Sequence, residues 1–146
     1  ELQLCDLCQS IAAAVATLTG AAVEPLVQRQ AAQPIRLAAS EGVPLALVLN
    51  ELIFNAVKHG DPWAGGPVRV LIDCDDRAAW VRVTNPSLGR PPGLDFAAGE
   101  GLGTGLALVQ ALLPPDHAHL SLRSEYGYVG AELRLEPPVV QLLSAP

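Results

Sequence analysis

The sequence lacks methionine, clusters of basic residues and long apolar runs. No methionine occurs among its 146 residues, so we expect the chain to be a piece of a longer protein. It has 9 Lys and Arg against 15 Asp and Glu, for a formal net charge of -6. Nucleic-acid binding rests on neutralising many phosphates, so this balance argues against a nucleic-acid partner. No stretch approaches the roughly 20 uninterrupted apolar residues of a membrane helix, and we expect a soluble fragment without membrane contact.

Cysteine is also scarce. The three cysteines, Cys5, Cys8 and Cys74, cannot all pair with one another. A zinc site would need a second pair beside Cys5-x-x-Cys8, and the sequence has none. We therefore expect buried or half-buried free thiols, which suit a reducing cytoplasm.

Two segments have apolar residues at helical spacing and clear stop signals. The first covers residues 4–18 and is followed by Gly20. The second covers residues 43–59, with Pro44 in the first turn, where a missing N–H costs nothing, and Gly60 after the last helical residue. Both are predicted to be helices.

The rest of the chain is predicted to form short strands, one long loop and a third helix. Extended segments are expected at residues 22–28 and 34–38, and hairpins at 68–74 with 78–84 and at 119–123 with 129–136. Residues 85–101, rich in Pro and Gly, predict a functional loop, and residues 102–113 predict a helix. This order indicates an α+β domain, a mostly antiparallel sheet with helices on one face. We expect a single domain, in which residues 1–20 form a helix leading from an upstream domain and residues 21–146 form the body.

Three polar residues share one face of the second predicted helix. At about 100° per residue, Glu51, Asn55 and Lys58 fall within about 60° of one another, opposite the apolar face. An Asn in mid-helix is intrinsically unfavourable, and its amide oxygen can bind a hard cation such as Mg²⁺, with Lys58 meeting phosphate. The alternative is a solvated polar face with an i, i+7 ion pair. Asn50 points about 100° away from Glu51 and is predicted to be a buried, hydrogen-bonded amide.

A glycine cluster precedes the third predicted helix. Gly101, Gly103 and Gly105 lead into the apolar residues 106–113. Glycines allow close approach of the backbone, and a helix start offers free N–H groups to phosphate. A phosphate cradle is therefore one interpretation, and an ordinary glycine-rich turn is the other. The segment is neither a Walker motif nor a Rossmann fingerprint.

Together these two segments resemble a known superfamily. Residues 51–60, ELIFNAVKHG, resemble the N box of the ATPases that include histidine kinases, DNA gyrase, MutL and the heat-shock chaperones. Residues 101–110, GLGTGLALVQ, are similar to its G2 box. The resemblance covers roughly residues 22–137 and implies the Bergerat fold of histidine kinase ATPase domains, a two-layer sandwich of a mixed sheet with helices on one face.

The resemblance also implies roles for individual residues. Asn55 would hold Mg²⁺, and Glu51 would orient or deprotonate the attacking group. Asn85 stands where the family has the Asp that accepts a hydrogen bond from the adenine amino group. The other residues implied in nucleotide binding are Lys58, His59, Gly89, Gly101, Gly103, Thr104, Gly105 and Leu106. Residues 89–99 would form the lid over ATP.

The implied function is that of the ATP-binding catalytic domain of a two-component sensor histidine kinase, with ATP and Mg²⁺ as cofactors. Its partners would be an upstream dimerisation domain with the acceptor histidine and a response regulator, in a homodimer. It would be cytoplasmic, or the cytoplasmic part of a membrane-bound sensor.

Two alternatives stay open. One is a serine kinase similar to the anti-sigma-factor kinases, in which the glutamate acts as a base toward a hydroxyl. The other is a pseudokinase that only docks a partner. It is motivated by Asn85 in place of Asp, by a short lid with Phe96 as its single phenylalanine, and by Ala131 where a Thr is common.

Overall fold

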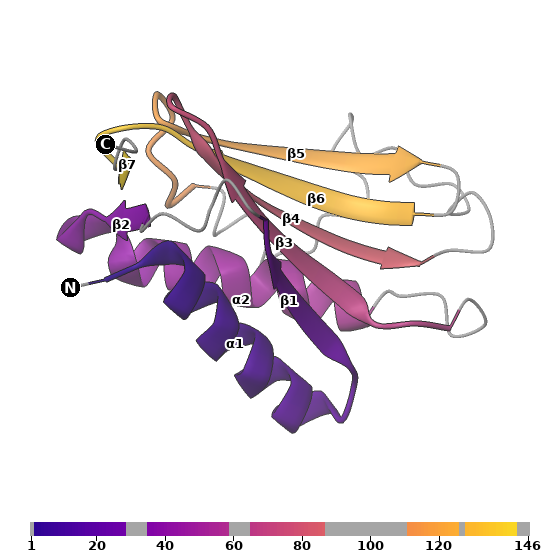
Figure 1. Cartoon of the computed structure of the whole chain (residues 1–146). Helices are drawn as coiled ribbons and strands as arrows, with labels where there is room; N and C mark the ends of the chain where they lie inside the picture. Colours follow the sequence, from indigo (N-terminus) through magenta and orange to yellow (C-terminus); the bar gives the residue numbers. More distant parts are fainter. Residues whose placement is uncertain (1, 29–34, 59–64, 87–110, 126–127, 143–146) are drawn as a thin grey trace.

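The chain folds into one main sheet with two helices on one of its faces. A computed structural model describes residues 2–28, 35–58, 65–86, 111–125 and 128–142. Helices α1 (Leu4–Thr19) and α2 (Gly42–Lys58) form one layer and the five-stranded sheet forms the other (Figure 1). Its strands are β1 (Val23–Val27), β3 (Val68–Cys74), β4 (Ala79–Pro86), β5 (Ala118–Glu125) and β6 (Tyr128–Leu135). The predicted α+β class and two-layer arrangement are confirmed.

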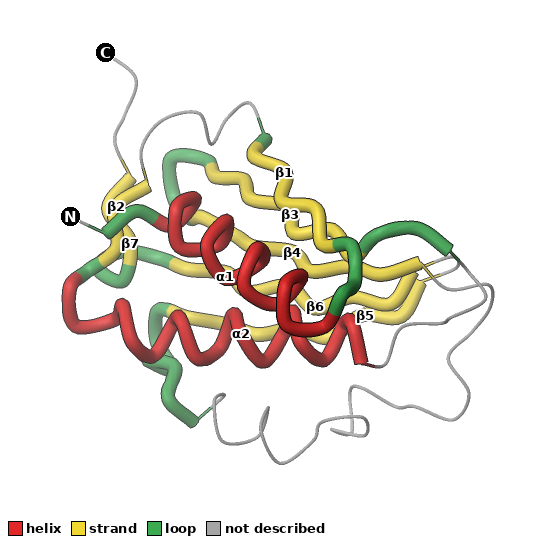
Figure 2. Tube along the Cα trace, turned by 90° about the horizontal axis from the view of Figure 1, so that it is seen from below, coloured by secondary structure: helices red, strands yellow, loops and turns green. Residues whose placement is uncertain are grey.

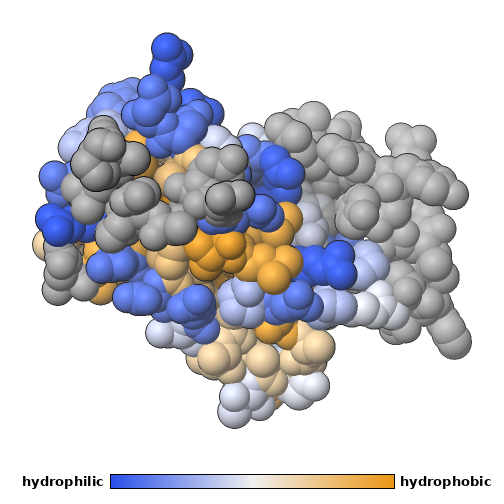
Figure 3. Space-filling view, viewed as in Figure 1, coloured by the Kyte–Doolittle hydropathy of each residue, from blue (hydrophilic) through white to orange (hydrophobic). Residues whose placement is uncertain are grey.

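The sheet is mixed, in the order β1-β3-β4-β6-β5. Strand β1 pairs parallel with β3, and the other pairs of neighbouring strands in the sheet are antiparallel. The Gln28 N–H donates to the Ile72 carbonyl and the Val68 N–H to the Ala22 carbonyl, so the even-numbered residues of β1 face β3. Pro25 therefore lies with its missing N–H toward the free edge, where it costs no ladder bond and discourages further pairing. An apolar patch lies near the middle of the face drawn in Figure 3, where β1 runs in Figure 1.

A second, two-stranded sheet lies near the N-terminus and was not fully predicted. Strand β2 (Ile35–Leu37) pairs antiparallel with β7 (Val140–Leu142), and Gln3 forms an isolated bridge to Arg36. Sequence reasoning gave β2 but missed β7, which forms by pairing with a strand far earlier in the chain. This small sheet joins the two ends of the described chain (Figure 2).

Helix α1 ends where its sequence places a stop. Gly20 follows α1 in the left-handed region, at φ 74°, and its N–H donates to the Ala16 carbonyl. Helix α2 begins one residue before the predicted start and is described to Lys58. The predicted third helix, residues 102–113, lies outside the described residues up to residue 110, and Ala111–Leu113 form a turn.

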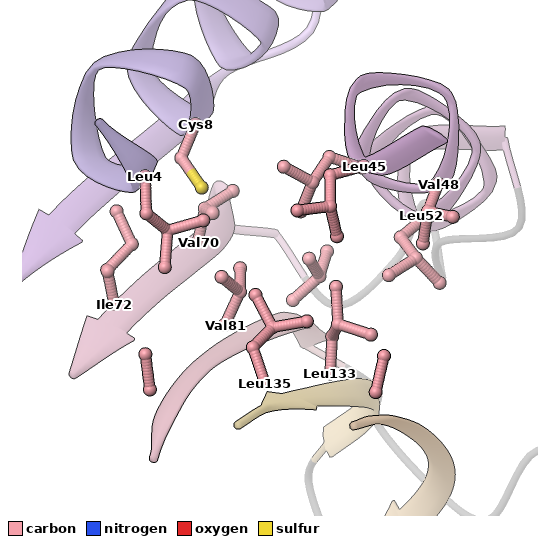
Figure 4. Packing of buried hydrophobic residues seen from close by; sticks show 14 of the residues in the cluster. Leu4, Cys8, Leu45, Val48, Leu52, Val70, Ile72, Val81, Leu133 and Leu135 are labelled. Carbon is pink, nitrogen blue, oxygen red and sulfur yellow. The ribbon is translucent and has the colours of Figure 1, made fainter. Parts of the chain in front are cut away.

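The core fills the space between the two helices and the sheet. Leu45, Val48 and Leu52 of α2 face Val81 and Leu133 of the sheet (Figure 4). From the other helix, Leu4 and Cys8 pack toward Val70 and Ile72. Helix α1 thus supplies part of the same core, because its buried residues Leu4, Cys8, Ala12 and Val15 recur every three or four positions.

Helix α2, with the short turn before it, bears on the expectation that the fragment has no membrane contact. By length and composition alone, Ala39–Lys58 passes the test for a membrane span, with a mean hydropathy of 1.2. In the structure one side of the helix packs against the sheet as part of the core. A core helix of this kind passes the same test, so the finding is weak evidence for a membrane span.

The β3–β4 hairpin turns where it was predicted to turn. The Asp75 carboxylate accepts hydrogen bonds from the backbone N–H groups of Arg77 and Ala78, both at 2.8 Å. These bonds favour the ionised form and hold the pKa of Asp75 below its usual value. The strand that follows is longer than predicted, however. It includes Asn85 and Pro86, which sequence reasoning had assigned to the loop at 85–101.

Candidate functional site

An open pocket of about 470 Å³ lies at the C-terminal end of α2. It is bounded by that helix end, the α1–β1 junction, the approach to β3 and the end of β4. Its lining consists of Ala21, Ala22, Ala56, Val57, Lys58, Gly65, Gly66, Val68, Asn85 and Pro86. Most of the lining side chains are therefore apolar, with Asn85 and Lys58 as the two polar ones, which is the usual composition of a small-molecule site.

Asn85 is the buried one of the two polar side chains that line this pocket. It is 7% exposed and is the single buried polar or charged residue among those that the structure describes. Strand alternation puts it on the helix-facing side of β4 with Val81 and Val83. Its partner across the sheet is Val129, near the end of the strand pair. A buried amide needs hydrogen-bond partners, so this position calls for a polar ligand or water.

Lys58 lies at the mouth of the pocket. It is exposed and is the last described residue of α2. A lysine in the last turn is favoured there because the carbonyl end of a helix carries partial negative charge. The structure thus brings together Lys58 and Asn85, which are 27 positions apart in the sequence and were both predicted to contact the nucleotide.

Glu51 and Asn55 lie outside the lining of this pocket, on a flank of the same helix. Both are half-buried, as expected for residues between the core face and solvent. At about 100° per residue, Asn55 points about 200° away from the pocket residue Val57, so the two lie on opposite flanks of α2. The burial of Glu51, Asn55 and Lys58 agrees with the predicted polar face, whereas the prediction of a buried Asn50 was wrong because that side chain is exposed.

Two glycines form a part of the pocket that sequence reasoning had treated only as a turn. Gly65 and Gly66 have φ of 68° and 95°, which non-glycine residues rarely adopt. A Cβ atom on Gly66 would lie 3.2 Å from the Cγ of Pro86, so the chain entering β3 passes close to the end of β4. The doubled glycine before Pro67 was the available signal for this close approach.

The remaining predicted site residues fall outside the described part of the chain. These are His59, Gly89, Gly101, Gly103, Thr104, Gly105 and Leu106. The predicted phosphate cradle and lid stay predictions.

The cysteines are free thiols, as predicted. Burial raises the pKa of all three, for Cys8 to about 12. Thiols are therefore held protonated, which disfavours both nucleophilic and metal-ligand roles. Within the described ranges, no group of three or more His, Cys, Asp or Glu side chains could hold a metal ion.

The side chains that line the pocket can contact a nucleotide. The apolar wall suits the faces of a planar base, and the Asn85 amide can pair with a polar base edge. The Lys58 ammonium can meet negative charge at the mouth. Mg²⁺ needs only one or two protein oxygens besides phosphates and waters, but Glu51 and Asn55 lie outside this lining, so their predicted role as cation ligands stays a prediction.

Comparison with known proteins places this arrangement in a family. Residues 41–141 match the model of the histidine kinase-, DNA gyrase B-, and HSP90-like ATPase family. None of the curated proteins matches the chain.

Solved structures of histidine kinases are similar to the fold. The histidine kinase domain of the Erythrobacter litoralis EL346 blue-light activated histidine kinase has a TM-score of 0.73 at 18% identity, over 92% of this chain and 61% of that one. The Acinetobacter baumannii histidine kinase AdeS gives 0.69 at 12% identity, over 94% and 66%. The histidine kinase domain of the E. coli osmosensor EnvZ gives 0.67 at 18%, over 99% and 92%. The chain thus spans less than two thirds of the first two, and all three likenesses concern the fold.

Proposed function

The chain belongs to the histidine kinase-, DNA gyrase B-, and HSP90-like ATPase family, and from this premise we propose that it is the catalytic domain of a two-component sensor histidine kinase. In this role it binds Mg-ATP and transfers the γ-phosphate to a histidine on an upstream dimerisation domain of a cytoplasmic homodimer. A response regulator then receives the phosphate. The observation that carries the proposal is the buried Asn85 amide, in one pocket with Lys58, at the end of the helix that bears Glu51 and Asn55.

Residues at different positions along α2 and β4 contact different parts of the nucleotide. The buried Asn85 pairs with the base edge, while the exposed Lys58 attracts the negatively charged end of the nucleotide. Asn55, one turn before Lys58, supplies an oxygen ligand to the cation. When bound, Mg²⁺ neutralises phosphate charge, and catalysis is then largely a matter of alignment. His59 and the glycines at 101, 103 and 105, with the N–H groups of Thr104 and Leu106, complete the phosphate contacts, and Gly89 begins the lid.

Nucleotide binding is the first measurement that tests this proposal. The 146-residue domain is expected to bind Mg-ADP in isothermal titration calorimetry, and EDTA is expected to weaken the binding because the cation links Asn55 to the phosphates. Absence of heat at millimolar Mg-ADP would favour the pseudokinase instead, for which the neutral Asn85 in place of Asp is the motivating residue.

Phosphotransfer requires the longer protein that carries the acceptor. With ATP labelled at the γ-phosphate, we expect label on a histidine, recognised because phosphohistidine is lost in acid and survives in base. Label with the reverse stability would identify a serine and favour the anti-sigma-factor-like alternative.

The variant Glu51→Gln separates these two acceptors by rate. A neutral imidazole nitrogen carries a free electron pair, so an orienting Glu51 can be replaced by its isosteric amide at a cost of less than about tenfold. A serine hydroxyl must lose its proton, and loss of the base then costs roughly 10²–10⁴-fold. Single-turnover rates at saturating ATP give the comparison, with Asn50→Asp, an exposed change on the same helix, as the control. A loss above a hundredfold in the longer protein would contradict the histidine acceptor.

A further inference from the structure

The buried polar side chain of the pocket, Asn85, is an amide. An amide can recognise different hydrogen-bond partners from those of a carboxylate. A carboxylate has only acceptors, so it pairs with an adenine amino group and repels the carbonyl oxygen that guanine carries at the same ring position. An amide has an oxygen acceptor and an NH₂ donor on one planar group. Asn85 can therefore accept from the adenine amino group or, after a half-turn of the amide, donate to guanine O6.

The surroundings of Asn85 leave both orientations available. Among the described residues, no hydrogen bond or ion pair involves the Asn85 side chain, and the residue is 7% exposed. The side chains of Ala22, Ala56, Val57 and Pro86 around it carry no donor or acceptor. None of these four side chains thus fixes which end of the Asn85 amide faces the pocket. The ligand then decides whether the amide oxygen or the amide nitrogen of Asn85 points into the pocket.

The other lining residues do not favour one orientation of the Asn85 amide over the other. The second polar side chain of the lining, Lys58, is exposed at the mouth and carries the opposite sign to a carboxylate. An ammonium does not repel guanine O6. Gly65 and Gly66 also line the pocket and add no side-chain donor or acceptor to it.

We propose that this pocket is permissive for purines and accepts guanine nucleotides as well as adenine nucleotides, with Asn85 as the residue that sets the specificity. The proposal rests on the proposed function, because it concerns the base of the same nucleotide. It widens the phosphate donor of that function from ATP alone to either purine triphosphate, ATP or GTP.

The test compares Mg-ADP with Mg-GDP by calorimetry on the 146-residue domain. The wild type is expected to bind the two within about tenfold of one another, since one flexible amide satisfies both bases. Asn85→Asp is expected to keep Mg-ADP binding and to weaken Mg-GDP by roughly 10–100-fold, because the new carboxylate faces O6. The matched control is Asn50→Asp, which makes the same chemical change at an exposed position of α2 and is expected to leave both affinities unchanged.

Several results would overturn the inference. A wild type that prefers ADP by more than about a hundredfold contradicts it while leaving the proposed function intact. An Asn85→Asp variant that binds both nucleotides with an unchanged ratio removes Asn85 as the specificity residue. Because a variant can fail to fold, the wild type is also titrated with Mg-IDP, which carries O6 without the 2-amino group, and weak IDP binding beside strong ADP binding contradicts acceptance of the carbonyl. A wild type that binds no nucleotide overturns both the inference and the proposed function.

Discussion

Asn55→Ala is expected to abolish Mg²⁺-dependent nucleotide binding while the domain stays folded. Asn55 lies half-buried on the flank of α2, outside the apolar core, so truncation leaves no large cavity. Alanine is also the better helix former, by up to about 0.7 kcal/mol. The fold is therefore expected to keep or slightly gain stability, while loss of the protein's amide ligand to the cation weakens Mg-ADP at least about a hundredfold.

The comparison with Asn50→Ala gives this prediction its control. Asn50 is on the same helix, is exposed, and points away from Glu51, so its truncation removes the same atoms without touching the proposed cation ligand. Calorimetry with Mg-ADP and thermal unfolding of both variants supply the two readouts. Binding by Asn55→Ala at wild-type strength would end the metal role of Asn55. Equal losses in both variants would mean that the helix, and not the ligand, had been damaged.

Where a segment forms its own pattern, the sequence was sufficient to predict its structure. The strand Val68–Cys74 alternates Val70, Ile72 and Cys74 inward with Arg69 outward, so its period identifies it without any neighbour. Helix α2 was equally clear, since Leu45, Leu49, Leu52 and Ile53 follow one face between Pro44 and the helix end. Such signals are local and survive without knowledge of the tertiary structure.

Features that depend on distant partners were missed or misplaced. Strand β7 is three residues long and exists through its pairing with β2, about one hundred positions earlier in the chain. Asn85 and Pro86 follow a strand and have loop-like composition, yet pairing with β6 carries β4 through both of them. That pairing turns Asn85 inward, and it explains why a residue predicted in a loop lies buried in a pocket wall.

The pocket itself also needed the fold. Ala21 and Gly65 have no chemistry that would single them out, and they become pocket residues because β1 lies parallel beside β3. The motif on α2 supplied the candidate ligands, but the distribution of those ligands around the helix is a structural result. Lys58 joins Asn85 in the pocket, while Glu51 and Asn55 occupy the flank opposite Val57.

That distribution depends on how α2 is rotated about its own axis, and a pair of leucine variants tests the rotation. Leu49 is 0% exposed and Leu47 is 47% exposed, although they are only two positions apart on the helix. Leu49→Ala is expected to lower the free energy of unfolding by about 2–5 kcal/mol, because it removes buried methyl groups and leaves a cavity against the sheet. Leu47→Ala is expected to change it by less than about 0.5 kcal/mol, since its side chain already contacts water.

Urea denaturation of the two variants and the wild type measures this difference. Both variants delete the same atoms and give the same gain in helix propensity, so the comparison isolates burial. Because Asn55 stands about 120° from Leu49 around the helix, any rotation that exposed Leu49 would move Asn55 as well. Equal losses at the two leucines would thus show that α2 is turned differently, and the polar flank with Glu51 and Asn55 would no longer be where the proposed cation site requires it.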